Sequence, residues 1–247
     1  MLSTLQLTRK PESGRTILLC IPGTYCSPEV FERIDEAAFP SLQLIPVSWM
    51  TSPGPWDIPT LGQRIADLLQ ELDAGPVLLA GHSTGGAISL AAALRGTGLL
   101  RGMLLADTGA NTKGHGDIES ILRAIEAGPS AEVLQLLLRR SFLHMPGDEL
   151  LQRLSSYASS VPRQAAIDAL SSQATLDMAA DLPGIDIPVV VLHGRHDQAR
   201  PIAHAELLVE RLPHAELRLV DTGHTPMVED PAAYEQALKR LCALVGL

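Results

Sequence analysis

The sequence predicts an α/β fold: a doubly wound, mostly parallel sheet with an inserted helical lid. Three observations predict it. Short apolar runs recur along the 247 residues, helix-like stretches separate most of them, and one region of about 80 residues breaks the alternation. Near-continuous apolar strands are typical of a parallel sheet covered on both faces. Their alternation with helices indicates a doubly wound arrangement.

Six apolar runs are expected to form the sheet, because each is short and most are bounded by glycine, proline or polar residues. They span 16–21, 42–47, 77–80, 103–106, 188–193 and 215–220. Residues 4–8 are expected to add an antiparallel edge strand. The helix-like stretches of the sheet region span 60–72, 86–95, 202–211 and 231–245.

The region between the fourth and fifth of these strands has no strand-like run. Its apolar residues recur instead at helical spacing, as in Ile118, Ile121, Leu122 and Ile125. A loop of this length without structure of its own is uncommon. We therefore expect residues 111–181 to form a helical lid of three or four helices, and residues 1–110 and 182–247 to form the core domain. The alternative is one extra crossover helix with loops.

Composition narrows the classes of partner. The net charge is −9, from 19 basic and 28 acidic residues, which argues against nucleic acid or an anionic membrane. Three cysteines without paired spacing do not indicate a disulfide framework or a zinc site. Neither a signal peptide nor a membrane span is visible. We expect a cytoplasmic monomer or homodimer that binds a small-molecule substrate.

The stretch Gly81-His82-Ser83-Thr84-Gly85 lies between an expected strand and an expected helix. It fits the pattern G-x-S-x-G, in which a sharp turn projects a serine oxygen away from the backbone. The flanking glycines avoid clashes in such a turn. The helix that follows supplies N–H groups and a partial positive charge where an oxyanion would form. Ser83 is therefore the candidate nucleophile.

A serine hydroxyl needs a general base that a third group orients. Asp197 follows the strand at 188–193, and His224 follows the strand at 215–220. All three residues are thus expected outside the carboxyl ends of strands, where catalytic groups gather in open α/β sheets. Asp107, after the strand at 103–106, is the alternative acid.

On these residues the chain resembles the α/β-hydrolase fold superfamily, in the subgroup with a helical cap. Residues 81–86 resemble its nucleophile elbow, 194–201 its acid loop and 223–231 its histidine loop. The resemblance implies a triad of Ser83, His224 and Asp197. It also implies an oxyanion hole formed by the backbone N–H groups of Thr84 and Thr24, although Pro22 stands where the family usually has histidine. Neither a metal nor a cofactor is implied.

The activity that the resemblance implies is hydrolysis of a carboxylic ester of a small, largely apolar substrate through an acyl-enzyme, as in carboxylesterases. Two alternatives share the triad. One is a carbon–carbon bond hydrolase of meta-cleavage products, and the other is a haloperoxidase-like perhydrolase, which resembles this chain in its Gly-His-Ser-Thr-Gly-Gly elbow. A ligand receptor of the same fold with little turnover is the alternative outside the enzymes.

Substrate contacts are expected from aromatic and apolar residues near the site. Both tryptophans fall in the loop after the second strand, and the other candidates lie in the lid or beside the expected oxyanion hole. The expected residues are Tyr25, Trp49, Trp56, Leu138, Phe142, Met145 and Tyr157. Arg139 and Arg140 of the lid either bind a carboxylate or form the solvated face of a helix.

Overall fold

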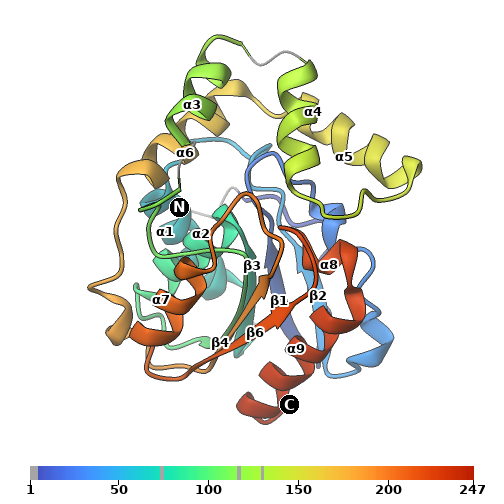
Figure 1. The fold of residues 1–247 in the computed structure, drawn as a ribbon. Coiled ribbons are helices and arrows are strands. Elements are labelled where there is room, and N and C mark those ends of the chain that lie inside the picture. The colour runs from blue at the N-terminus through green and yellow to red at the C-terminus, as the bar shows by residue number, and fades with distance from the viewer. Residues whose placement is uncertain (1–4, 73–74, 116–117, 129–130) are drawn as a thin grey trace.

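A computed structural model describes residues 5–72, 75–115, 118–128 and 131–247. Within these ranges six strands form one sheet in the order β2-β1-β3-β4-β5-β6, and every neighbouring pair is parallel. Helices cover both faces of the sheet (Figure 1). The predicted doubly wound α/β fold is confirmed.

The strands lie at or near their predicted positions. Their bounds are β1 Thr16–Ile21, β2 Leu42–Pro46, β3 Val77–His82, β4 Leu100–Ala106, β5 Val189–Gly194 and β6 Ala215–Val220. Alternate side chains of a strand point to opposite faces, so each strand contributes apolar side chains to the core on both sides of the sheet. In β1, Ile17 and Leu19 join one apolar cluster, whereas Leu18 and Cys20 join the other.

One face of the sheet is covered by α1 (Ile58–Glu71), α2 (Thr84–Ala93) and α7 (Ala203–Arg211), whose apolar residues join the cluster of Ile17. The other face is covered by α9 (Pro231–Val245), by the short α8 (Pro226–Glu229) and by the 3₁₀ turn η1 (Pro28–Phe31). Local sequence fixes two of the starts. The Asp57 side chain accepts from the N–H of Thr60, and that of Asp230 accepts from Ala233, which caps α1 and α9.

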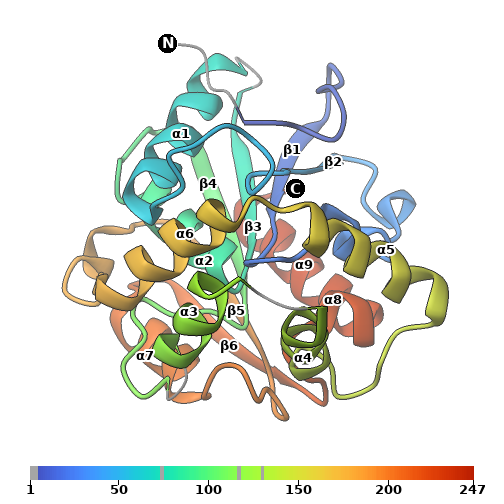
Figure 2. The same ribbon diagram turned by 90° about the horizontal axis from the view of Figure 1, so that it is seen from above.

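Four helices separate β4 from β5 in the chain: α3 (Ile118–Glu126), α4 (Ala131–Arg140), α5 (Asp148–Ser160) and α6 (Arg163–Thr175). Figure 1 shows them together above the sheet, and Figure 2 shows them over the strands when the molecule is seen from above. Helix α3 packs against α6 and α4 against α5, while α6 also touches α1 and α2. The division into a core of 1–110 and 182–247 and a lid of 111–181 stays a prediction.

The expected antiparallel strand at residues 4–8 is wrong in its described part. Thr4 lies outside the described residues, and Leu7 makes one isolated antiparallel bridge to Val47. The physical reason lies in the partner, because Pro46 has no N–H to donate to an extended ladder. Two further bonds, from Thr8 N–H to Pro46 O and from Ser48 N–H to Gln6 O, complete the contact.

Two features lie outside this layered core. Two more 3₁₀ turns lie in the connections of the chain: η2 (Glu36–Ala38) precedes β2, and η3 (Leu182–Gly184) precedes β5. Among the described residues, none of the helices combines the length and the apolar character needed to cross a bilayer.

Candidate active site

Ser83 lies at the turn between β3 and α2 in a backbone conformation that side chains seldom adopt. Its φ is 53° and its ψ is −121°, which holds local strain. Backbone hydrogen bonds hold this conformation. Ser83 N–H donates to Ala106 O, and Ser83 O accepts from the N–H groups of Gly86 and Ala87 and from the Thr108 hydroxyl. The strained turn leaves the Ser83 side chain facing a cavity above the sheet.

The glycines beside Ser83 are required by close packing. A Cβ atom on Gly85 would lie 2.0 Å from the backbone oxygen of Ile21, and one on Gly81 would lie 2.6 Å from Cα of Gly86. A Cβ on Gly23 would lie 2.9 Å from Cβ of Ser83. The loop after β1 therefore passes directly against the turn at Ser83.

The two backbone groups expected to form the oxyanion hole lie in these adjoining segments. Thr84 is the first residue of α2, so its N–H has no acceptor within the helix. Thr24 follows Gly23, and its hydroxyl lies 2.8 Å from the hydroxyl of Thr84. The Trp49 indole N–H donates to Pro22 O at 2.8 Å, which ties the loop that carries Thr24 to the core.

Asp197 and His224 are joined by a hydrogen bond of 2.7 Å between Oδ2 and Nδ1. The N–H groups of Ala199 and Arg200 donate to Oδ1 of the same carboxyl. Burial by itself would raise the pKa of Asp197, but the charge and hydrogen bond of His224 outweigh it, and the pKa falls well below its usual range. Asp197 is thus an ionised partner that orients His224.

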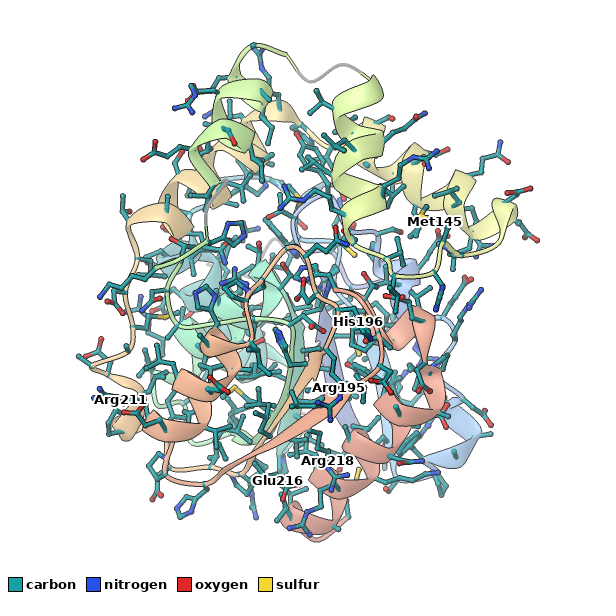
Figure 3. All side chains as sticks on the ribbon, in the orientation of Figure 1. Met145, Arg195, His196, Arg211, Glu216 and Arg218 are labelled. Atoms are coloured by element: carbon teal, nitrogen blue, oxygen red, sulfur yellow. The ribbon has the colours of Figure 1, made fainter. Side chains whose placement is uncertain are left out.

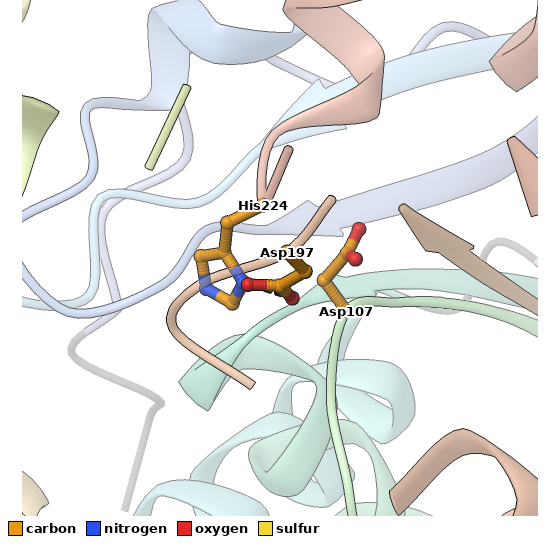
Figure 4. Close-up of side chains that lie close together, drawn as sticks. All are labelled: Asp107, Asp197 and His224. Atoms are coloured by element: carbon orange, nitrogen blue, oxygen red, sulfur yellow. Dashed lines mark hydrogen bonds and ion pairs between the residues drawn. The ribbon is translucent and has the colours of Figure 1, made fainter. Parts of the chain in front are cut away.

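Asp107 lies on the other side of Asp197 from His224 (Figure 4). Its side chain is fully buried, its Oδ1 accepts from Gly194 N–H at 2.8 Å, and its Oδ2 has no partner. Burial and the charge of Asp197 raise the pKa of Asp107 well above its usual range. The negative charge of this pair of carboxyls is therefore favoured on Asp197 over Asp107.

The same three side chains also satisfy a simple distance criterion for a metal site. Asp107, Asp197 and His224 each place one possible ligand atom within 4.8 Å of the others. However, Nδ1 of His224 is already hydrogen-bonded to Asp197, and Oδ1 of Asp107 already accepts from Gly194 N–H. A protonated Asp107 is moreover a poor ligand. The donor set fits a hydrogen-bonded acid–base pair better than a metal.

Changing Asp107 to asparagine is expected to raise stability at neutral pH. Below the ordinary pKa of 3.8 the carboxyl is protonated in both the folded and the unfolded state, so it contributes no pH dependence there. Above that pH the unfolded chain loses the proton while the folded protein keeps it, so stability falls as pH rises. Asparagine removes this dependence and also suits the positive φ of 49°.

Thermal unfolding of Asp107→Asn and the wild type between pH 4 and pH 8 measures this effect. Each kcal/mol gained is expected to raise Tm by about 2–4 °C, with the gap narrowing towards pH 4. Asp221→Asn is the control, because that side chain is 82 % exposed. A loss of stability at pH 7 that does not vary with pH would show instead that Asp107 is ionised in the folded protein.

His82 is a buried neutral histidine beside the site. Its Nε2 donates to the backbone oxygen of His224 at 2.7 Å, which leaves Nδ1 without a proton. Burial, with the nearby charge of His224, lowers the pKa of His82 to about 3. Burial also lowers the pKa values of His115, His193 and His204.

The protein is therefore expected to lose stability below pH 6.5. A histidine with a lowered pKa binds its proton only in the unfolded state between its folded pKa and 6.5, so acid favours unfolding. For His82 the loss is about 1.4 kcal/mol per pH unit, or about 2 kcal/mol at pH 5. Urea unfolding at pH 7 and pH 5 measures it. The free energy of unfolding of His82→Gln should fall less on acidification than that of the wild type. The control His196→Gln, at an exposed position, should behave as the wild type.

The cavity in front of Ser83 is lined on one side by the turn at Ser83, Gly23, Thr24 and His224, and on the other by helices α3 to α6. The helices contribute mainly apolar side chains: Ile118, Ile121, Leu134, Leu137, Leu138, Leu154 and Leu170. Ser83 and His224 thus face one partly apolar chamber.

Of the expected substrate contacts, Tyr25, Leu138 and Phe142 line this cavity. Trp49, Trp56, Met145 and Tyr157 do not. Both indole N–H groups donate to backbone oxygens within the core and its loops, since Trp49 bonds Pro22 O and Trp56 bonds Ser52 O.

The other two expected contacts lie elsewhere. Met145 is 39 % exposed, and Figure 3 labels it at the loop between α4 and α5. Tyr157 lines a separate hollow beside Ser48, to whose hydroxyl it is hydrogen-bonded.

The cavity lining also includes residues that were not among the expected contacts, and His115, Gln173 and Arg200 are three polar examples. The sequence carried little signal for them. Arg200 lies three residues after Asp197, in the loop already assigned to the acid, and Gln173 lies on a helix whose buried face is formed by alanines. Of the adjacent arginines of α4, Arg140 lines the cavity, whereas Arg139 is exposed.

The turn at Ser83 and the paired Asp197 and His224 define a doubly wound α/β protein with a hydrolase-type site at the carboxyl ends of its strands. The sequence model of the alpha/beta hydrolase family matches residues 18–237. The chain belongs to the alpha/beta hydrolase family.

Known proteins support a hydrolase. The chain is 24 % identical over 194 residues to 3-oxoadipate enol-lactonase 2 of Acinetobacter baylyi, covering 76 % of this chain and 72 % of that protein. Its fold is similar to an esterase from Exiguobacterium antarcticum, with a TM-score of 0.83 and 18 % identity over 98 % of this chain and 95 % of the other. The fold is also similar to that of a bromoperoxidase from Bacillus anthracis, with a TM-score of 0.85 and 17 % identity, over 97 % of this chain and 94 % of the other.

Proposed function

We propose that the protein is a serine hydrolase that cleaves a carboxylic ester, or the related acyl bond of a lactone, through an acyl-enzyme on Ser83. The observation that carries the proposal is the 2.7 Å bond between His224 and Asp197 beside the cavity that Ser83 lines. A base oriented by a buried carboxylate next to a serine on a strained turn is the arrangement that acyl transfer needs.

In the proposed mechanism, Asp197 holds Nδ1 of His224 so that Nε2 acts as the general base. His224 removes the proton of the Ser83 hydroxyl as Oγ attacks the acyl carbon. The N–H groups of Thr24 and Thr84 stabilise the oxyanion. His224 then gives its proton to the departing alcohol oxygen. A water, deprotonated by His224, attacks the acyl-enzyme, and its collapse releases the carboxylic acid and restores Ser83.

Helices α3 to α6 are proposed to act as the lid of this site. They contribute the apolar part of the cavity, which fits the hydrophobic part of an ester and limits the access of water to the acyl-enzyme. An ester and a lactone differ only in whether the alcohol leaves or stays attached. The likeness to an enol-lactonase over three quarters of the chain supports including lactones as substrates.

A panel of p-nitrophenyl esters from acetate to octanoate, together with γ- and δ-lactones, tests the proposal. We expect hydrolysis of short or medium esters and covalent labelling by a fluorophosphonate at Ser83, located by mass spectrometry. Labelling at another residue would contradict the proposal, as would turnover without any labelling. A stable complex with a ligand, without product, would support a receptor instead.

A further inference from the structure

The cavity has a polar wall whose hydrogen-bonding groups lack partners. Nine of the described residues bury a side-chain nitrogen or oxygen atom that has no hydrogen-bond partner. Five of these nine line the cavity of Ser83: Tyr25, His82, His115, Gln173 and Arg200. A buried polar atom without a partner costs free energy. Their gathering at one cavity therefore indicates groups that a bound molecule satisfies.

Gln173 offers a hydrogen-bond donor close to the reacting centre. Its side chain is almost wholly buried, and its Oε1 accepts from the hydroxyl of Thr84 at 3.1 Å. The Nε2 amide group is consequently the end without a partner. Because Thr84 follows Ser83 directly, this amide lies near the place where the acyl group is attacked.

Arg200 offers a charged donor in the same wall. The residue is only 3 % exposed. Its Nη1 donates to Asn111 O at 3.1 Å and lies 2.9 Å from His204 Nδ1, while its Nε has no partner. Burial lowers the pKa of Arg200 to about 10, so the guanidinium stays charged at neutral pH. A guanidinium has donors and no acceptor, and it binds carboxylates in preference to neutral groups.

Arg200 brings a positive charge to the cavity. Arg200 and Arg140 both line it. Asp197 and Asp107 are the acidic groups whose charges act on Arg200, and burial raises the pKa of Asp107 well above its usual range. The histidines of the polar wall are neutral, since their pKa values are lowered.

We propose that the substrate carries a carboxylate that Arg200 binds, while Gln173 donates to a substrate oxygen nearer the scissile bond. The inference rests on the proposed function and names its substrate class. The substrate is the half-ester of a dicarboxylic acid, or a lactone with a carboxylate side chain, whose aliphatic part lies along the apolar helices of the cavity.

A matched pair of substrates tests the proposal on the wild-type enzyme. Monomethyl adipate and methyl hexanoate have the same chain, with a carboxylate in the first where the second has a methyl group. We expect kcat/KM to be about tenfold to a hundredfold higher for the half-ester, as is typical of a charge-assisted hydrogen bond. The half-esters of succinate and glutarate test whether the carboxylate site lies closer to the scissile ester than adipate requires. Equal or lower kcat/KM for every half-ester overturns the proposal.

Variants locate the group responsible. Arg200→Met should reduce the half-ester preference by about tenfold or more, and Arg200→Lys should keep part of it. Arg139→Met is the matched control, because Arg139 is exposed and lies outside the cavity lining. Gln173→Leu should raise KM for both esters. A preference that persists in folded Arg200→Met, as judged by thermal unfolding, overturns the role of Arg200.

A binding measurement separates this proposal from the proposed function. Calorimetric titration of Ser83→Ala with adipate and with hexanoate compares two products that differ by one carboxylate. Tighter binding of adipate, lost on adding Arg200→Met, supports the carboxylate site even if no ester is hydrolysed. Ser83-dependent hydrolysis of neutral esters, without any preference for adipate in rate or binding, leaves the proposed function standing and overturns this one.

Discussion

Replacing Ser83 by alanine is expected to lower the rate of ester hydrolysis on the order of 10⁴-fold or more. The variant removes the oxygen that attacks the acyl carbon in the proposed mechanism, and no other described group takes the same place at the turn. Alanine keeps the Cβ atom that lies against Gly23, so the backbone at φ 53° is not disturbed by a new contact. Rates with a p-nitrophenyl ester and thermal unfolding curves together measure the effect.

Two companions make the Ser83 result decisive. His224→Gln should cause a loss of similar size, because members of one catalytic unit do not contribute additively. Ser156→Ala, an exposed serine of α5, should behave as the wild type. Undiminished hydrolysis by Ser83→Ala would place the activity at another residue and would end the proposed mechanism.

Gly85→Ala is expected to be the most damaging small substitution to the fold near the site. The added Cβ would lie 2.0 Å from the backbone oxygen of Ile21 and 2.6 Å from that of Pro22. Backbone atoms of a central strand cannot move aside as the end of a flexible side chain does. We expect a loss of about 3 kcal/mol or more in the free energy of unfolding, or failure to fold.

Urea unfolding and soluble yield measure the Gly85 effect. Gly184→Ala is the matched control, since a Cβ there would meet nothing within 4 Å. If Gly85→Ala folded with wild-type stability and full activity, the packing of α2 against the end of β1 would be looser than the structure describes.

The elements of the sheet were predictable because their sequences are locally unambiguous. β1 and α9 begin and end where expected, since an apolar run bounded by polar residues fixes the first and Asp230-Pro231 starts the second. Helix α6 gave a weaker signal, because its buried face consists of Ala165, Ala166 and Ala169 rather than large apolar residues.

The candidate site was predictable where several neighbouring residues together form a motif that a particular chemistry requires. The turn at Ser83 and the loops of Asp197 and His224 fall in this class. The substrate contacts were less predictable, because side-chain type does not give direction. Trp49 is aromatic yet packs in the core, whereas Arg200 is charged yet buried at the cavity. From sequence alone, a charged residue in a loop is predicted to be exposed to solvent, because its neighbours in space are not known.

The order of strands in the sheet has a consequence for the newly made chain. β4 pairs with β5, but all of residues 107–188 leave the ribosome between them. His82 and His224 are 142 positions apart. At about 5–20 residues per second, the turn at Ser83 is synthesised about 7 to 28 seconds before His224. During translation, four of the six strands (β2, β1, β3 and β4) can pair before β5 is made. The edge of the apolar strand β4 then stays unpaired. Nascent chains are therefore most prone to aggregate in that interval, and a chaperone would protect them there.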